Sequence, residues 1–251
     1  MKLSRLLIIL AVLTVACQCW PSGGFGGVKS HCNCSSYPVV KAQDKPALNE
    51  TILSDIQVPS PYYDVCLLID TFNLSLTVFF KGEPIRKYPI AVGKPSSETP
   101  VGVWEVVDKS DLPGTGTGTR WMRLNIPCGN FGVHGTNNPS SIGTYASGGC
   151  VRLHNLHVEE IYPWVAVGTR VIIAGNPFGR FGEDYPLLNQ GSCGSAVQAV
   201  QYTLKRLGFY KNEADGIFGP GTAQAVKDFR LKKGLAEGSQ VDEEIYHLLG
   251  L

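Results

Sequence analysis

The sequence predicts two folded units: a mainly β domain with one short helix, followed by a small all-α domain of three helices. Short runs rich in β-branched and aromatic residues, separated by turn residues, fill residues 62–175, and this is typical of successive β-hairpins. After residue 194 the apolar residues recur at helical spacing instead. With 251 residues, of which 43% are hydrophobic and 17% charged, the chain is long enough to bury a core in each unit.

The charge balance excludes some classes of partner. The 22 basic and 21 acidic residues give a net charge of +1, so the whole chain offers no field that would attract nucleic acid or an anionic membrane. Partners therefore have to be inferred from local sites, and none of those sites points to nucleic acid or to a protein partner.

Residues 1–16 are typical of a signal peptide. Two basic residues precede the apolar run Leu6–Ala16, which is too short to span a bilayer and ends at a Trp-Pro-Ser-Gly-Gly break. The sequence Leu-Thr-Val-Ala-Cys ending at Cys17 also resembles a bacterial lipobox, with Thr14 where Leu is commonest. Ordinary cleavage and lipidation would both leave Cys17 as the first mature residue, so a lipid anchor to the membrane stays open. Either route predicts a protein that acts outside the cytoplasm.

Residues 17–61 are expected to be a spacer, because they are rich in glycine, proline and serine and lack the apolar repeat that builds a core. Within them, Cys32 and Cys34 lie beside His31 and could contribute to a metal site. No second ligand pair follows at zinc-site spacing, which favours disulfides or free thiols. The 8 cysteines of the chain suit an exported protein, and their pairing cannot be chosen from sequence.

The β domain is predicted strand by strand. The expected strands are Val65–Asp70, Leu74–Phe80, Lys87–Val92, Val101–Val107, Arg120–Ile126 and Arg170–Ala174. The turn residues 71–73 and 81–84 separate the first three. Apolar residues between 153 and 167 fall near helical spacing and predict one short helix that begins near Asn155. The alternate glycines of residues 113–119 lead directly into a strand, which favours a mobile loop over a phosphate-binding loop.

The all-α domain is predicted to span residues 194–251, after a linker of residues 176–193. The first helix carries Val197, Val200, Leu204 and Leu207 and ends at Gly208, a suitable C-cap. Turns over residues 215–221 precede a second helix, which carries Ala223, Val226, Phe229 and Arg230 and ends at Gly234. The third helix is predicted to be capped by Asp242.

The reactive residues concentrate between Phe131 and Asn155. His134 lies sixteen residues (150 − 134) before Cys150, and thiol acyl transfer needs this pair, because the thiolate attacks and the imidazole can remove its proton. The segment Ser147-Gly148-Gly149 precedes the thiol, and its glycines would leave backbone N–H groups accessible as an oxyanion hole. Arg152 adds a charge that favours the thiolate and could bind a substrate carboxylate.

Other interpretations of the same residues have to be weighed. Cys150 could be half of a disulfide, although catalysis requires it to be unpaired. A Cys128–Cys150 bridge would block the site, whereas pairing of Cys128 elsewhere, for example with Cys66 or Cys193, would stabilise it. A zinc site could nominally use His134, Cys150, His154 and His157, but their spacing matches no common zinc motif. The favoured thiol chemistry needs neither a metal nor a cofactor.

Residues 62–174 resemble the catalytic domain of the YkuD-type L,D-transpeptidases of bacterial cell walls. The resemblance rests on the segments VHGTNNP (133–139), SGGCVRLHN (147–155), VGTRVII (167–173), YPIAVG (88–93) and TPVG (99–102). It implies a β-sandwich in which Cys150 is the nucleophile, His134 its base, and the carbonyl of Gly135 the group that orients the imidazole. Where the family usually has a histidine directly before Gly149, this chain has Gly148, so the contact made by that histidine is absent.

Residues 194–251 resemble the peptidoglycan-binding domain found at the ends of wall hydrolases and transferases. The shared positions include VQAVQ (197–201), DGIFG (215–219) and TAQAV (222–226). Together the two resemblances imply an extracytoplasmic enzyme, in the cell wall or anchored on the outer face of the membrane, that cross-links stem peptides through a Cys150 thioester. The alternatives are an L,D-carboxypeptidase with the same site, a non-catalytic wall-binding protein and a zinc-dependent wall amidase.

Overall fold

The computed structural model describes residues 64–111, 117–179 and 185–251. The predicted signal peptide (1–16), the lipidation site at Cys17, the spacer (17–61) and most of the Gly-Thr run lie outside the described residues. Within the part that is described, no helix is long and apolar enough to cross a membrane.

A mainly β domain occupies the first part of the described chain, as predicted. Its strands are β1 (Val65–Asp70), β2 (Ser75–Phe80), β3 (Glu83–Pro89), β4 (Val92–Gly93), β5 (Gly102–Ser110), β6 (Trp121–Leu124), β7 (Gly132–His134), β8 (Tyr145–Ser147), β9 (Val151–Arg152) and β10 (Arg170–Ala174). Eight of them pair in one sheet in the order β3-β2-β1-β10-β5-β6-β7-β9, and β4 pairs with β8. Most neighbours are antiparallel, but β1–β10, β4–β8 and β7–β9 are parallel.

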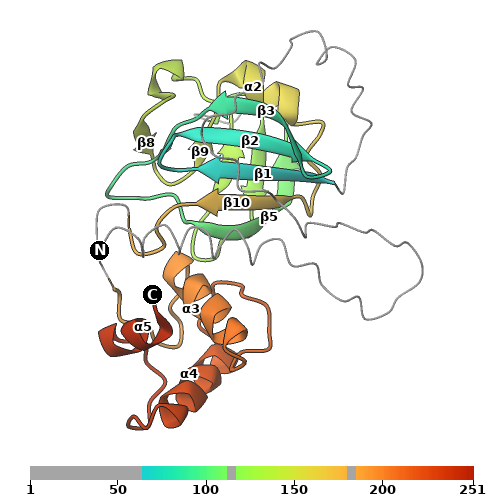
Figure 1. Cartoon of the computed structure of the whole chain (residues 1–251). Coiled ribbons are helices and arrows are strands. Elements are labelled where there is room, and N and C mark those ends of the chain that lie inside the picture. Colours follow the sequence, from blue (N-terminus) through green and yellow to red (C-terminus); the bar gives the residue numbers. More distant parts are fainter. Residues whose placement is uncertain (1–63, 112–116, 180–184) are drawn as a thin grey trace, which may run out of the picture.

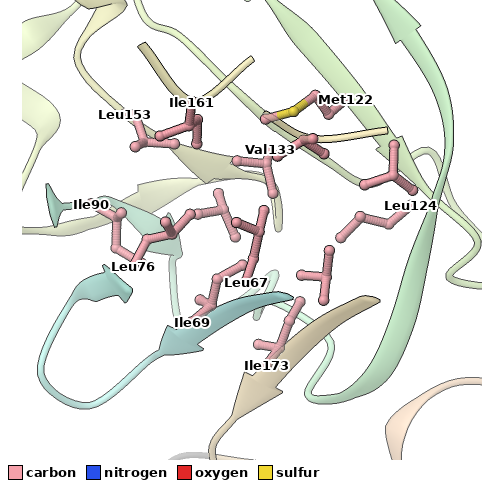
Figure 2. Packing of buried hydrophobic residues seen from close by; sticks show 14 of the residues in the cluster. Leu67, Ile69, Leu76, Ile90, Met122, Leu124, Val133, Leu153, Ile161 and Ile173 are labelled. Atoms are coloured by element: carbon pink, nitrogen blue, oxygen red, sulfur yellow. The ribbon is translucent and has the colours of Figure 1, made fainter. Parts of the chain in front are cut away.

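The sheet bends at β5, which belongs to both of its halves. The beginning of β5 pairs with β10, its end pairs with β6, and the register shifts between Val106 and Asp108. Such an irregularity bends a strand and increases its twist. Side chains from both halves consequently share one core: Leu67 of β1 gathers with Met122 of β6 and Val133 of β7 (Figure 2). The fold is therefore that of a β-sandwich, which confirms the predicted class.

The hairpin between β2 and β3 corrects the prediction that residues 81–84 form the turn. Phe80 pairs with Glu83 and Phe79 pairs with Pro84, so the turn itself is Lys81-Gly82. Both turn residues have positive φ, 52° and 85°, which is the conformation of a tight two-residue turn that matches the twist of its strands. Proline is tolerated in β3 because this strand lies at the edge of the sheet.

The predicted strand Lys87–Val92 is also wrong in its C-terminal half. The chain leaves the sheet after Pro89, and Ala91 exchanges hydrogen bonds of 2.9 and 2.8 Å with Arg152 before β4 begins. The short strands β4, β7, β8 and β9 were not predicted, because two or three residues carry no periodic signal. A 3₁₀ helix, η2 (Pro139–Ser141), precedes β8, and the predicted short helix is α2 (Asn155–Ile161).

The C-terminal part is helical, as predicted. Its helices are α3 (Ser195–Arg206), α4 (Pro220–Lys232) and α5 (Glu243–Leu249). The carboxylate of Asp242 accepts a hydrogen bond of 3.1 Å from the Ile245 N–H, which confirms the predicted cap. The assignment of Pro220 to a turn is wrong, since it is the first residue of α4, where proline costs no hydrogen bond.

Helix α3 lies beside β5 and β10, and α4 and α5 lie farther from the sheet, as Figure 1 shows. The side-chain amide of Gln198 extends the β ladder: its Oε1 accepts from the Val103 N–H at 2.8 Å and its Nε2 donates to the Val103 carbonyl at 2.9 Å. Cys128, in the β6–β7 connection, forms a disulfide with Cys193, which confirms one of the two partners left open by the sequence. Phe178 and Leu188, from the predicted linker, pack into the helical core.

Candidate active site

Two paired strands place His134 and Cys150 on the same face of the sheet. β7 and β9 run parallel, with Val133 opposite Val151 and His134 opposite Arg152. Val133 and Val151 point into the core, where they are 0% and 1% exposed. Because side chains alternate along a strand, the neighbouring residues Cys150, His134 and Arg152 lie on the other face. The thiol and the imidazole are therefore candidates for one site.

The His134 imidazole is held on two sides. Its Nδ1 lies 2.5 Å from the Gly135 carbonyl, and its ring packs against Trp121 with a centroid distance of 5.3 Å. A carbonyl can only accept, so Nδ1 carries the proton and Nε2 keeps its lone pair. Burial lowers the pKa of His134, and the positive charge of Arg152 lowers it further, whereas hydrogen bonds to the Gly135 and Thr117 backbone raise it. The balance favours a neutral imidazole that can accept a proton.

The Cys150 thiol is partly buried and forms no disulfide within the described residues. Its Sγ lies 3.7 Å from the Asn130 carbonyl, in the connection that also carries Cys128. Burial raises the pKa of Cys150, while a backbone hydrogen bond from Gly132 and the charge of Arg152 lower it. Because burial dominates, the resting group is a thiol, and attack on a carbonyl needs a base.

The Ser147-Gly148-Gly149 segment has a different role from the expected one. Ser147 Oγ donates to the Cys150 carbonyl at 2.6 Å and accepts from the Gly149 N–H at 3.0 Å. The Gly149 N–H is thus engaged. The sequence had suggested that it would be free to bind an oxyanion, and this expectation is not met. Gly149 is required for another reason, since its φ is +114° and a β-carbon there would meet the Phe131 ring at 2.6 Å.

Gly148 occupies an exposed position with room for a side chain. A β-carbon built on Gly148 would meet nothing within 4 Å, and its carbonyl accepts a hydrogen bond of 2.8 Å from Ser97 Oγ. The backbone here would accommodate the histidine that the family usually carries. Its replacement by glycine therefore leaves the turn that presents Cys150 unchanged.

Arg152 is a charged group that affects both reactive side chains. Its guanidinium lowers the pKa of Cys150 and that of His134. Its Nε is buried and has no hydrogen-bond partner among the described residues. A zinc site would need three or four ligands close together. Within the described ranges no three His, Cys, Asp or Glu side chains lie close enough together to hold a metal ion.

Several residues of the site were not found from the sequence. The Asn130 carbonyl and the Trp121 ring are brought to the site by strand pairing and by the path of the connecting loop. No local sequence pattern predicts such contacts. Thr119 and Asn155 lie beside Gly135 in space, and the Thr117 backbone hydrogen-bonds to His134, although all three are distant from these residues in sequence. The glycines at 118 and 135 were the available signal, because close packing of backbone requires a missing side chain.

Family comparisons agree with both resemblances. The model of the YkuD L,D-transpeptidase catalytic domain matches residues 66–173, and that of a peptidoglycan binding domain matches residues 193–248. YkuD of Bacillus subtilis, classed as an L,D-transpeptidase, is 39% identical over 119 residues, which span 46% of this chain and 70% of that protein. YkuD of Bacillus licheniformis is 42% identical over 99 residues, 39% of this chain and 59% of that protein.

Solved structures include an L,D-transpeptidase from Mycobacterium smegmatis, with 25% identity, a TM-score of 0.40, and coverage of 45% of this chain and 59% of that one. The catalytic domain of the Enterococcus faecium L,D-transpeptidase is 23% identical, with a TM-score of 0.39 and coverage of 45% and 98%. The match thus covers about three fifths of the length of some of these proteins, and 70% and 98% of the length of two others. From the family models and the Bacillus subtilis relative, the chain belongs to the YkuD-type L,D-transpeptidase family and carries a peptidoglycan-binding domain behind its catalytic domain.

Proposed function

We propose that this protein is an exported L,D-transpeptidase that cross-links peptidoglycan stem peptides, with Cys150 as nucleophile and His134 as general base. The observation that carries the proposal is the placement of the two side chains on one face of β7 and β9, with the Nδ1 of His134 held by the Gly135 carbonyl. A base oriented in this way presents Nε2 toward a thiol that cannot ionise unaided.

The first half of the reaction forms a thioester. His134 Nε2 takes the proton of the Cys150 thiol as Sγ attacks the carbonyl of the L-to-D peptide bond in a tetrapeptide stem. The tetrahedral intermediate then collapses, the C–N bond breaks, and the imidazolium gives its proton to the departing amine of D-alanine. Since the Gly149 N–H is engaged by Ser147, the N–H of Cys150 itself is the oxyanion donor that we propose.

The second half transfers the acyl group to an amine. A side-chain amine of a neighbouring stem attacks the thioester carbonyl, and His134 accepts the proton lost by that amine. The C–S bond then breaks, and the imidazolium returns the proton to the leaving sulfur to regenerate the Cys150 thiol. Arg152 offers a positive charge at the site for a carboxylate of the donor stem. The helical domain would hold the enzyme on the wall, which raises the local concentration of stems. No cofactor takes part in these steps.

The test is the reaction of purified protein with a tetrapeptide donor and an amine-bearing acceptor. Mass spectrometry should show an acyl adduct on Cys150 that disappears as cross-linked product forms, whereas Cys150→Ala should show neither and still fold. Cross-linking by Cys150→Ala would refute the nucleophile.

The same assay separates the alternatives. Hydrolysed donor without cross-linked product would identify an L,D-carboxypeptidase, and wall binding without any turnover would identify a non-catalytic protein. Loss of turnover to a chelator, with no loss to iodoacetamide, would favour a zinc amidase.

A further inference from the structure

Asn155, the first residue of α2, fills the space between two backbone segments that contact the catalytic imidazole. Its Oδ1 accepts a hydrogen bond of 3.3 Å from the Thr119 N–H. A β-carbon built on Gly118 or on Gly135 would overlap this same oxygen. The amide is therefore packed against both glycines at once.

The two segments are already neighbours in the sheet. The Gly135 N–H donates to the Arg120 carbonyl at 3.1 Å, which extends the β6–β7 ladder beyond the pair Trp121 and His134. Gly118 has a φ of +63°, in the left-handed region, and a β-carbon on it would also meet the backbone of Gly135 and Thr136. Only a backbone without side chains can approach this closely, and the Asn155 amide is the polar group placed against it.

Each segment supplies one carbonyl to the His134 ring. The Gly135 carbonyl binds Nδ1, and the Thr117 carbonyl forms the second backbone hydrogen bond that raises the pKa of His134. Hydrogen bonds of this kind stabilise the imidazolium that forms when the thiol is deprotonated. If the two segments separated, the ring would lose both its orientation and this stabilisation.

We infer that Asn155 is a positioning residue for the general base: its side-chain amide clamps the 117–119 segment onto Gly135 and so holds both carbonyls on the His134 imidazole. Asn155 does not touch the reacting atoms and acts only through these backbone groups. The inference rests on the proposed role of His134, and it adds a residue on α2 to a site otherwise built from strands and connections.

The charged groups around the ring must be kept constant in a test. Arg152, from β9, lowers the pKa of His134, and Cys150 lies on the same face. The guanidinium of Arg120 lies over the Tyr162 ring, 5.5 Å from its centroid. A Cys150→Ala background removes the thiol and leaves both arginines in place, so that changes in the His134 titration report on Asn155.

The experiment follows the imidazole of His134 by NMR as a function of pH, in Cys150→Ala protein. Asn155→Ala should lower the pKa of His134, because the carbonyl contacts that favour the imidazolium loosen. Asn155→Asp keeps the size and the acceptor of the side chain and adds a negative charge, so it should raise the same pKa. The fall in Asn155→Ala is the diagnostic result, because the carboxylate of Asn155→Asp raises the pKa of a nearby imidazole whether or not the amide acts as a clamp.

With Cys150 present, Asn155→Ala should lower kcat about tenfold or more, with little change in KM, because misplacing a base is costly while substrate contacts remain. Asn125→Ala is the matched control, since Asn125 is exposed just after β6 and its Oδ1 likewise accepts from a backbone N–H, that of Glu105 on β5 at 2.8 Å. It should leave the His134 titration unchanged.

An unchanged or raised His134 pKa in folded Asn155→Ala would overturn the inference. The titration needs no turnover, so a wild-type protein without transpeptidase activity whose His134 still responds to Asn155 would refute the proposed function and leave the clamp standing. Folding of each variant is checked by circular dichroism, and Asn155→Ser, whose neutral and shorter side chain should lower the same pKa, keeps the test decisive if the alanine variant does not fold.

Discussion

Single residues set the protonation of the reactive pair through burial and one charge. Burial raises the pKa of Cys150 and lowers the pKa of His134, so both groups are held in their neutral forms. Arg152 lowers both values, which favours the thiolate but opposes the imidazolium. A stable thiolate–imidazolium pair is therefore not expected at rest, and the proposed mechanism has to transfer the proton during attack.

The first prediction concerns Arg152. Arg152→Gln should raise the pH midpoint of Cys150 alkylation by iodoacetamide, because it removes a charge that lowers the thiol pKa while burial persists. The rate is measured on the Cys150 peptide by mass spectrometry. Arg123→Gln, at an exposed position of β6, is the control and should leave the midpoint unchanged. A midpoint that falls in Arg152→Gln would contradict the assignment.

The second prediction links His134 to stability at acid pH. Its pKa in the folded protein lies below the ordinary value of 6.5, so the unfolded chain binds the proton first as the pH falls through that value. The folded state loses stability from there down to the folded pKa. His134→Gln should therefore make the fall in urea midpoint between about pH 7.5 and 5 shallower. His247→Gln, whose side chain is 63% exposed, is the control, and an equal effect there would contradict the prediction.

At the scale of the elements, β1 is a central strand of the catalytic domain and a main contributor to its core. It pairs with both β2 and β10 and contributes Leu67 and Ile69, each 0% exposed, to the shared core (Figure 2). Because β10 carries the sheet on to β5 and β6, the packing of β1 supports the half of the sheet that holds His134. Loss of this packing should lower the free energy of unfolding substantially, whereas loss of an exposed leucine on α2 should change it little.

The third prediction tests that contrast. Leu67→Ala should lower the free energy of unfolding by about 2–5 kcal/mol, since it removes transfer energy and leaves a cavity. Leu156→Ala makes the same chemical change on α2, where the side chain is 78% exposed, and should change stability by less than about 0.5 kcal/mol. Urea unfolding measures both, and similar losses in the two variants would show that β1 is not a packing centre.

At the scale of the whole molecule, the wall-binding helices are joined to the catalytic domain by more than a connecting chain. The Cys128–Cys193 disulfide spans 65 residues and ties the β6–β7 connection, which also carries Asn130, to the start of the helical domain. The Gln198 amide adds a second attachment at Val103 of β5. The two domains are thus expected to move as one body.

The fourth prediction concerns this disulfide. Replacing Cys128 and Cys193 together by serine should lower the free energy of unfolding by about 4 kcal/mol, the loop-closure value for a bridge of this span. Adding a reductant should destabilise the wild-type protein by a similar amount and have little effect on the double variant. If reductant destabilised both proteins equally, the stabilisation would have to come from another group.

The sequence determined the elements whose signals are local. Helix ends followed from single residues: Asp242 caps α5, and Gly208 and Gly234, with φ of 85° and 74°, follow the ends of α3 and α4. The long strands followed from β-branched runs, and the segments around His134 and Cys150, with three further segments, carried the family resemblance. These features depend on residues within a few positions of one another or on motifs of fixed length, so no tertiary information was needed to find them.

Only the tertiary structure decided how those elements act together. The register of β7 against β9 places His134 and Cys150 on one face, and β9 is too short to be predicted. The hydrogen bond from the Gly149 N–H to Ser147 Oγ shows that Gly149 serves the turn and does not have the expected role of an oxyanion donor. The clamp at Asn155 and the partner of Cys128 join residues 36 and 65 positions apart. Contacts over such separations depend on how the whole sheet closes, and the physical reason is that a local pattern predicts the type of an element but not which distant segment it packs against.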